Sequence, residues 1–415
     1  MTRVTPVQGP FRAYTPIHNP SLRCVVLPGN ARLDTVTVKE STLVPGLAGV
    51  PAAESSISYI DGQIGILEYR GFPIEVLADK STFEETAWLL LNGTLPTKSE
   101  LDAFKAKLVA NRAVPQSVLD MITALPKEGH PMAALQAGYA ALGMCSPECN
   151  VSDSNDRREA ITRLIAATPT LVAAYARSRD GKDFVAPDDS LDHAANFLWM
   201  LNGEKPAELI AHVMDVALIL HADHTMNAST FTARVVASTE SDPYSVCAAA
   251  IGSLKGPLHG GANERVLIQL EKIGSVDAVS AWLAGQIENK GKIMGFGHRV
   301  YKTKDPRSTN LQKLTREMFA QFGSTPIYDI ALKLEEEVVA RLGAKGIHPN
   351  VDFFSGIVYQ KMGIPTDVFT PIFAIARVAG WLAHWDEQMQ DNRLFRPGQI
   401  FTGHHDGKYV PIAER

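Results

Sequence analysis

His259 stands in a sequence setting that favours chemistry over packing. It follows Gly256-Pro257-Leu258 and precedes Gly260-Gly261, in a predicted turn at the start of a helix. Glycines let a backbone approach a ligand closely, and the positive helix N-terminus disfavours a protonated imidazole. A neutral histidine there can donate a hydrogen bond to a developing enolate, which makes His259 a candidate catalytic residue. A purely structural turn histidine is the alternative.

Asp352 and the segment 295–307 suit proton abstraction and anion binding. Asp352 is flanked by valine and phenylalanine side chains, and a carboxylate in apolar surroundings has a raised pKa and can serve as a base. The segment 295–307, GFGHRVYKTKDPR, combines two glycines and His298 with four basic residues, which suits an anionic ligand. A solvated basic loop is the alternative, but it would not need glycines on both sides of Phe296.

His221 and His224 end a predicted buried helix and share one of its faces, because they are three residues apart. A metal site is one interpretation, although the sequence places no third ligand. A hydrogen-bonded core pair is another, and an anion contact for one histidine is a third. Farther along, Arg377 lies on one predicted helix face with Phe373 and Trp381. A buried arginine needs an anionic partner, and no acidic residue lies one turn away. A ligand carboxylate is therefore a candidate partner, with a snorkelling arginine as the alternative.

The elements that must position these side chains are predicted to be helical almost throughout. Near the start, Ile57–Asp61 and Gly65–Tyr69 are β-like runs, and Asp61-Gly62 between them is a hairpin signal. From Thr82 onward the pattern is helical, beginning with a capping-box pattern, Thr82-x-x-Glu85. Strands and helices do not alternate, which argues against a doubly wound sheet. The sequence therefore predicts a mainly α protein with a small β element near the N-terminus.

Composition narrows the class of protein. The chain has 415 residues, enough for two or three domains of ~100–200 residues. A formal net charge of -5 argues against a general nucleic-acid or anionic-membrane binder. The 4 cysteines are too few for a disulfide framework. No secretory signal is predicted, and charge or proline interrupts each apolar stretch short of the ~20 residues of a membrane span. We expect a cytoplasmic protein.

Several motifs together resemble the citrate synthase family. GPLHGGANE, MGFGHRVYKTKDPR, PNVDFFSG and FAIARVAGWLAHW occur in the family order, and SSISYIDGQIGILEYRGFPIE and LHADHTMNASTFTARVVAST are also similar to its members. The resemblance covers roughly residues 45–415. It implies a citrate-synthase-like two-domain helical fold, with a large domain at 46–260 and 364–415 and a small domain at 261–363. Residues 1–45, rich in proline and glycine and without a clear period, are predicted to be an N-terminal arm. The chain looks closer to the short dimeric form than to the hexameric form with its long N-terminal β domain.

The resemblance also implies a role for each candidate residue. Asp352 corresponds to the base that removes the methyl proton of acetyl-CoA, and His259 to the histidine that stabilises the resulting enol. His298 corresponds to the histidine that polarises the oxaloacetate carbonyl and helps hydrolyse citryl-CoA. The residues implied to bind oxaloacetate are His224, Arg307, Arg377 and Arg396, the last contributed by the partner subunit of a homodimer. Those implied to bind coenzyme A are Gly295, Phe296, Gly297, Lys302 and Lys345.

No metal and no cofactor is expected, since acetyl-CoA is a substrate and the family chemistry uses none. His221 looks like a supporting residue. The nearest rival function is 2-methylcitrate synthase, which uses propionyl-CoA with the same machinery, and the motifs do not separate the two. A metallohydrolase using His221, His224 and Asp352 is a rival of another class. A helical binding protein that has lost catalysis is a third, and the intact His259, His298 and Asp352 argue against it.

Overall fold

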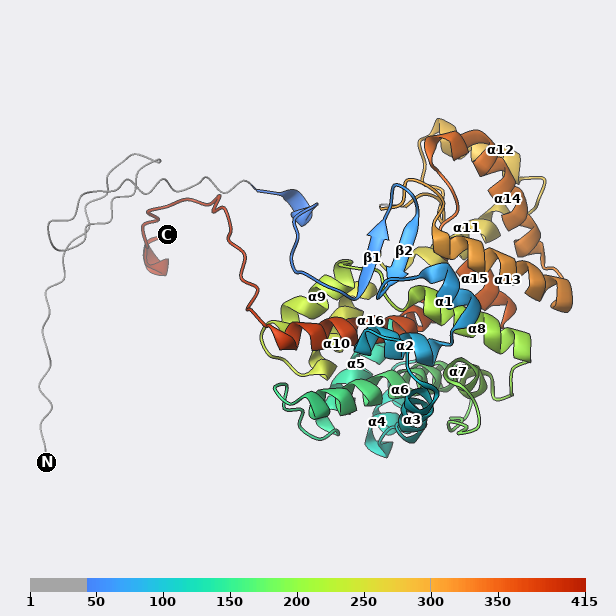
Figure 1. Ribbon diagram of the computed structural model, residues 1–415. Coiled ribbons are helices and arrows are strands. Elements are labelled where there is room, and N and C mark those ends of the chain that lie inside the picture. The colour runs from blue at the N-terminus through green and yellow to red at the C-terminus, as the bar shows by residue number, and fades with distance from the viewer. Residues whose placement is uncertain (1–42, 299) are drawn as a thin grey trace, which may run out of the picture. The chain divides into compact units, whose positions relative to one another are not determined.

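The computed structural model describes residues 43–298 and 300–415, and this part of the chain is mainly helical (Figure 1). The mainly α class and the small β element near the N-terminus are confirmed. The described chain divides into two units: Ala52–Pro397, and the segments that precede and follow it. Within the second unit, no described side chain is buried. The predicted arm at 1–45 lies outside the described residues apart from 43–45.

The elements run in the following order. The strands are β1 (Ser58–Asp61), β2 (Ile66–Tyr69) and β3 (Phe72–Pro73). The helices of the first half are α1 (Ile74–Lys80), α2 (Phe83–Asn92), α3 (Lys98–Ala110), α4 (Gln116–Thr123), α5 (Pro131–Met144), α6 (Ser154–Arg179), α7 (His193–Asn202) and α8 (Glu208–His221). Those of the second half are α9 (Ala228–Ala237), α10 (Pro243–Leu254), α11 (Ala262–Ile273), α12 (Val279–Glu288), α13 (Pro306–Phe322), α14 (Pro326–Leu342), α15 (Val351–Lys361) and α16 (Phe369–Gln390). Short 3-10 helices lie at Pro45–Leu47, Gly343–Lys345, Thr366–Val368 and Ile412–Glu414.

The three strands form one antiparallel sheet in the order β1-β2-β3. Asp61 pairs with Ile66 at the end of the first hairpin, so the predicted hairpin around Asp61-Gly62 is confirmed. The predicted capping box at Thr82 is present in half: the Thr82 hydroxyl accepts from the Glu85 N–H. The Glu85 carboxylate instead accepts from the Ser81 hydroxyl at 2.7 Å. Both contacts satisfy polar groups at the start of α2.

Helix α16 is the axis of the core and packs against α2, α6, α8, α9 and α10 (Figure 1). The segment Thr366–Gln390 is long and apolar enough to cross a membrane, but its most apolar window is entirely buried. Core helices share this character. One stripe of α16 carries Phe373, Arg377, Trp381, His384 and Gln388, spaced so that they face the same side. Polar side chains are thus placed at the centre of an apolar core, where they need partners.

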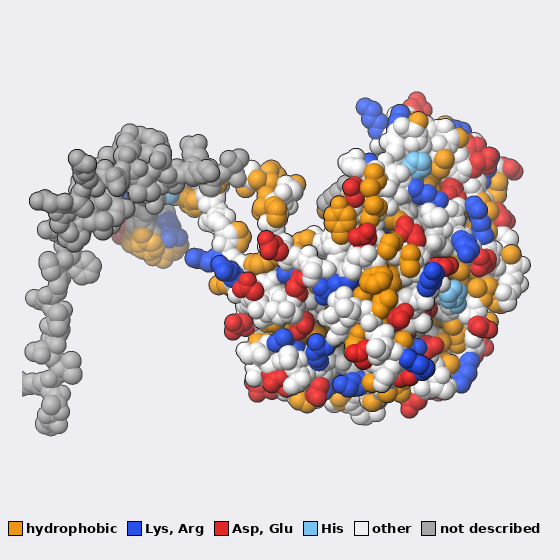
Figure 2. Space-filling model, in the orientation of Figure 1, with side chains coloured by type: hydrophobic (Ala, Val, Ile, Leu, Met, Phe, Trp, Pro, Cys, Tyr) orange, Lys and Arg blue, Asp and Glu red, His pale blue; other side chains and the backbone are white. Residues whose placement is uncertain are grey.

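A second group of helices supplies the other side of the candidate site. Helix α11 packs against α14 and α15, α12 packs against α14, and α13 packs against α15. Helices α11 and α13 also contact α16 and α8, respectively. The whole of Ala52–Pro397 is one compact unit, so the division into large and small domains stays a prediction. On its visible face, acidic and basic side chains are interspersed (Figure 2).

Candidate active site

The predicted site residues reach one region from six separate elements. Their places are the turn after α8 (His224), the turn before α11 (His259), the loop between α12 and α13 (His298), the first turns of α13 (Arg307) and α15 (Asp352), and the middle of α16 (Arg377). The rings of His224 and His298 lie 5.4 Å apart, centroid to centroid. The charges of Arg307 and Arg377 favour the ionised form of Asp352. The structure therefore gathers residues that are far apart in the sequence.

His259 is held neutral, with its proton on Nδ1. The backbone N–H of Ser229 donates to His259 Nε2 at 3.2 Å, so Nε2 must be the unprotonated nitrogen. The Ser229 hydroxyl lies 2.8 Å from the same atom and accepts from Trp381 Nε1 at 3.1 Å. Burial, followed by the charge of Arg377, lowers the pKa of His259 to about 4. Burial and the charge of Arg377 thus both favour the neutral imidazole that the sequence predicted.

His298 is fixed in the opposite tautomer. The backbone N–H groups of Val300 and Tyr301 donate to His298 Nδ1 at 3.0 and 3.2 Å, which leaves the proton on Nε2. Burial, followed by the charge of Arg307, lowers the pKa of His298 to about 4. At neutral pH the side chain is thus an uncharged hydrogen-bond donor through Nε2.

His224 lies beside His298 and is buried. Its Nε2 is 3.2 Å from the Tyr301 hydroxyl, and burial, followed by the charges of Arg307 and Arg377, lowers its pKa well below the usual value. His221 has a supporting place: its Nδ1 lies 2.7 Å from the Ala217 carbonyl oxygen. Among the described residues, no group of three or more His, Cys, Asp or Glu side chains is arranged to hold a metal ion.

Asp352 has the environment of a base. Burial raises its pKa to about 6, although the charge of Arg307 opposes the shift. Asn350 caps α15 by accepting from the Asp352 N–H at 3.1 Å. Among the hydrogen bonds of the described residues, none ends on the Asp352 carboxylate. The carboxylate is therefore available to take a proton near neutral pH.

The two buried arginines are held differently. Arg307 makes a two-pronged contact with Asp305, from Nε at 3.0 Å and from the terminal nitrogen at 2.8 Å. Arg377 donates from Nε to the His221 carbonyl at 2.7 Å, and its guanidinium carbon lies 4.6 Å from the centre of the Phe373 ring. No ion pair to Arg377 occurs within 43–298 or 300–415. Arg377 thus has no carboxylate in direct contact among the described residues, although the charges of Asp223 and Asp352 act on it.

Backbone hydrogen bonds join the segment 295–297 to the segment that leads into Asp352. Gly297 N–H donates to the His348 carbonyl, and Asn350 N–H to the Gly295 carbonyl, both at 2.9 Å. Gly295 has φ +80, and a Cβ there would lie 2.8 Å from the Phe353 ring. Only glycine suits that position. The loop of His298 and the helix of Asp352 are therefore placed relative to each other by backbone contacts.

Of the remaining predicted ligand residues, three lie at the surface and Phe296 is partly buried. Lys302 and Lys345 are exposed, and the ring of Phe296 packs 4.6 Å from that of Phe353. Arg396 is exposed in the irregular segment that follows α16. Their predicted roles in binding coenzyme A, and of Arg396 in the partner's site, stay predictions.

Sequence reasoning missed four buried partners of the site: Ser229, Tyr301, Asp305 and Asp223. The Asp223 carboxylate accepts from the Ser58 hydroxyl and from the Thr225 N–H, and it faces His384 Nε2 at 3.4 Å. Burial raises the pKa of Asp223, but His384, Arg377 and Ser58 outweigh it and lower the pKa below its usual value. Only the position of Asp223 between His221 and His224 could have marked it.

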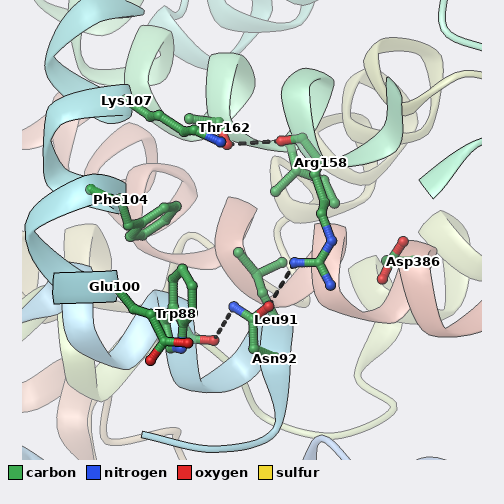
Figure 3. Close-up of a pocket in the computed structure, with 11 residues that line it drawn as sticks. Trp88, Leu91, Asn92, Glu100, Phe104, Lys107, Arg158, Thr162 and Asp386 are labelled. Carbon is green, nitrogen blue, oxygen red and sulfur yellow. Dashed lines mark hydrogen bonds between the residues drawn. The ribbon is translucent and has the colours of Figure 1, made fainter. Parts of the chain in front are cut away.

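A separate pocket of about 220 Å³ opens between α2, α3, α6 and the end of α16 (Figure 3). Its walls include the rings of Trp88 and Phe104 and the charged groups of Lys107, Arg158 and Asp386. None of the predicted site residues lines it. The pocket is therefore distinct from the candidate active site.

Comparison with known proteins finds citrate synthases. The family model described as "Citrate synthase, C-terminal domain" matches residues 46–398. A protein of Synechocystis sp. named citrate synthase is 54% identical over 370 residues, covering 89% of this chain and 93% of the relative. A citrate synthase of Deinococcus radiodurans is 49% identical over 375 residues, covering 90% and 100%.

Solved structures are similar over the same region. The crystal structure of citrate synthase from Pyrobaculum aerophilum has a TM-score of 0.85 and 43% identity, covering 90% of this chain and 95% of that one. A ternary complex of carboxymethyl coenzyme A and oxaloacetate with citrate synthase from Thermoplasma acidophilum has a TM-score of 0.85 and 36% identity, covering 90% and 100%. The likeness therefore spans the fold as well as the sequence.

Proposed function

This chain belongs to the citrate synthase family and is an acyltransferase of the tricarboxylic acid cycle that converts acyl into alkyl on transfer; on that premise, we propose that His259, His298 and Asp352 carry out its chemistry. The observation that supports this assignment best is the pair of opposite tautomers. On one nitrogen, His259 accepts one backbone N–H and His298 accepts two, so each neutral imidazole has one fixed N–H donor on the other nitrogen.

The first step is proton removal from the methyl group of acetyl-CoA. The Asp352 carboxylate takes the proton while His259 Nδ1–H donates to the thioester oxygen, where negative charge develops. A base with a pKa of about 6 is largely ionised at neutral pH and is a stronger base than an ordinary aspartate. The product of the step is an enolate, whose oxygen accepts the hydrogen bond from His259 while the proton stays on Asp352.

The second step is carbon–carbon bond formation. His298 Nε2–H donates to the carbonyl oxygen of oxaloacetate, which makes the carbonyl carbon more electrophilic. The enolate carbon attacks it and the thioester C=O re-forms. The new alkoxide takes a proton through His298 Nε2–H, and the proton that Asp352 removed in the first step balances this transfer, which gives citryl-CoA. Water then cleaves the thioester, releasing citrate and coenzyme A. The thermoplasmal relative was crystallised with oxaloacetate and a coenzyme A derivative, which supports these two substrates here.

The oxaloacetate carboxylates are proposed to lie against His224, Arg307 and Arg377. Two buried guanidinium groups suit a dianion, because charge strengthens a hydrogen bond from arginine to a carboxylate. Arg307 would bind through the terminal nitrogen that does not contact Asp305. Arg377 has no carboxylate partner within the described residues, so a substrate carboxylate would complete its contacts. Arg396 is proposed to complete the site of a partner subunit in a homodimer, and the enzyme is proposed to act in the cytoplasm.

Acetyl-CoA is proposed as the preferred acyl donor over propionyl-CoA. The Phe373 ring lies 6.5 Å from the His259 ring, where it would crowd a longer acyl group. One methylene changes the transition-state energy by only ~1–3 kcal/mol, or roughly 10–200-fold in rate. A thiol-release assay at saturating oxaloacetate, comparing kcat/KM for the two thioesters, tests both the activity and the preference. A ratio that favours propionyl-CoA would identify a 2-methylcitrate synthase with the same residue roles.

A further inference from the structure

The tip of the first β-hairpin touches the loop that carries His298. The backbone N–H of Lys302 donates to the Gly62 carbonyl at 2.7 Å. A Cβ on Gly62 would lie 2.3 Å from the Val300 carbonyl oxygen, and one on Gly65 would lie 2.8 Å from the Thr303 side chain. Real Cβ atoms do not approach backbone oxygens so closely. Gly62 is therefore required by this contact.

Val300, the residue that Gly62 touches, also holds the catalytic imidazole. The Val300 N–H and the Tyr301 N–H are the two donors to His298 Nδ1. The Tyr301 hydroxyl, in turn, lies 3.2 Å from His224 Nε2. Val300 thus connects the hairpin tip to His298, because it contacts Gly62 and also helps to fix the tautomer and orientation of the imidazole.

The base of the same hairpin contacts the turn that carries His224. The Ser58 hydroxyl, at the start of β1, donates to the Asp223 carboxylate and accepts from the Thr225 N–H. The Tyr69 hydroxyl, at the end of β2, donates to the Asp223 carbonyl at 2.8 Å. Thr225 has φ +50, a conformation that non-glycine residues adopt only where their surroundings enforce it. The hairpin therefore braces the loops of both His224 and His298.

We propose that the β1–β2 hairpin is a positioning element for oxaloacetate activation, with Gly62 as the positioning residue that seats the His298 loop. Packing alone does not account for the tip, because the neighbouring Gln63 and Ile64 are exposed. A side chain at position 62 would press on the Val300 peptide and displace the His298 donor from the oxaloacetate carbonyl. This proposal rests on the role of His298 given above.

The test compares Gly62→Ala with Gln63→Ala, a control in the same turn whose side chain is exposed. The infrared stretch of the oxaloacetate carbonyl, measured with the substrate saturating, reports how strongly the enzyme polarises it. We expect Gly62→Ala to return the stretch toward its value in free solution and to lower kcat ~10–100-fold, as misplacement by an ångström does. Gln63→Ala should leave both unchanged. An unchanged stretch and kcat in a folded Gly62→Ala enzyme would overturn the proposal.

Two further measurements keep the result interpretable. If Gly62→Ala does not fold, amide hydrogen exchange at Lys302 in the unaltered enzyme decides: protection supports the contact with Gly62, and rapid exchange with oxaloacetate bound refutes it.

His298→Gln, measured in parallel, separates this proposal from the function on which it rests. If His298→Gln keeps full turnover, the role of His298 is wrong; if only Gly62→Ala keeps it, the positioning role alone is wrong.

Discussion

At the scale of single residues, the surroundings of Asp352 set both its reactivity and its effect on stability. Burial raises its pKa to about 6, from ~3.9 for an unperturbed aspartate. The folded protein therefore holds this proton more tightly than the unfolded chain does. The resulting stabilisation is fully present below the unfolded pKa and is lost as the pH rises through about 6. Catalysis needs the ionised form, so activity and this part of the stability change in opposite directions.

The pH profile of kcat/KM should therefore have one acidic limb with an apparent pKa near 6, below which activity falls because Asp352 is protonated. His259 and His298 should add no limb above their pKa values of about 4, since both are already neutral. Steady-state rates between the two values, with buffer ionic strength held constant, provide the measurement. A flat profile across this range would argue against Asp352 as the base.

Replacing Asp352 by asparagine should remove that limb and lower kcat by ~10²–10⁴-fold, the usual cost of losing a general base. Oxaloacetate should still bind, because its proposed contacts are His224 and the arginines. Titration calorimetry with oxaloacetate and the thiol-release assay measure the two effects separately. Asp277→Asn, which changes an exposed carboxylate, is the matched control. Near wild-type turnover in the Asp352 variant would show that another group takes the proton.

At the scale of secondary structure, Arg307 and Arg377 differ in how much their removal would destabilise the fold. Asp305 caps α13, pairs with Arg307 and accepts from the Val351 N–H at the start of α15 at 3.4 Å. Removing Arg307 would leave a buried carboxylate unpaired between two helix ends, which costs about 3–5 kcal/mol. Removing Arg377 would free one backbone carbonyl, at about 1–3 kcal/mol.

Arg307→Leu should therefore lower the melting temperature more than Arg377→Leu does. Both changes should raise the KM for oxaloacetate far more than the KM for acetyl-CoA, because hydrogen bonds to a charged group are worth about 1.5–3 kcal/mol each. Thermal unfolding and steady-state kinetics measure the two effects. Equal changes in both KM values would mean that these arginines do not bind the carboxylates.

The elements show what a sequence can and cannot predict. The hairpin at Asp61-Gly62 and the cap at Thr82 were predictable because their hydrogen bonds join residues a few positions apart. The environment of Asp352 was predictable because its own neighbours in the chain supply much of the apolar surroundings. The contact between Asp223 and His384 was not predictable, because 161 positions separate the two residues. Only the packing of α8 on α16 brings them together. The hydrogen bond between Ser229 and His259 was not predictable for the same reason.

At the scale of the whole molecule, the proposed homodimer gives a test of shared sites. Arg396 is exposed, and the segment around it carries exposed Leu394, Ile400 and Phe401, an arrangement that suits contact with a second copy. If Arg396 completes the partner's site, a mixed dimer of Arg396→Leu and Asp352→Asn subunits has one intact site.

Mixing those two inactive variants with subunit exchange should therefore restore activity, to roughly a quarter of the wild-type value for random pairing, since half the dimers are mixed and each has one whole site. Arg307→Leu mixed with Asp352→Asn is the control and should restore none, because both residues belong to the same chain's site. Failure of the first mixture despite demonstrated exchange would place Arg396 outside the partner's site.

The stripe of α16 also constrains how this protein can change in length. Phe373 and Arg377 contact His221, Trp381 contacts Ser229, and His384 and Gln388 contact Arg234. Each added residue would rotate everything after it by roughly 100°, because a helix turns once in 3.6 residues. A single insertion or deletion in this stretch would turn several of these partners away at once. A change in length within α16 is therefore disfavoured, and the register of this helix is expected to stay fixed.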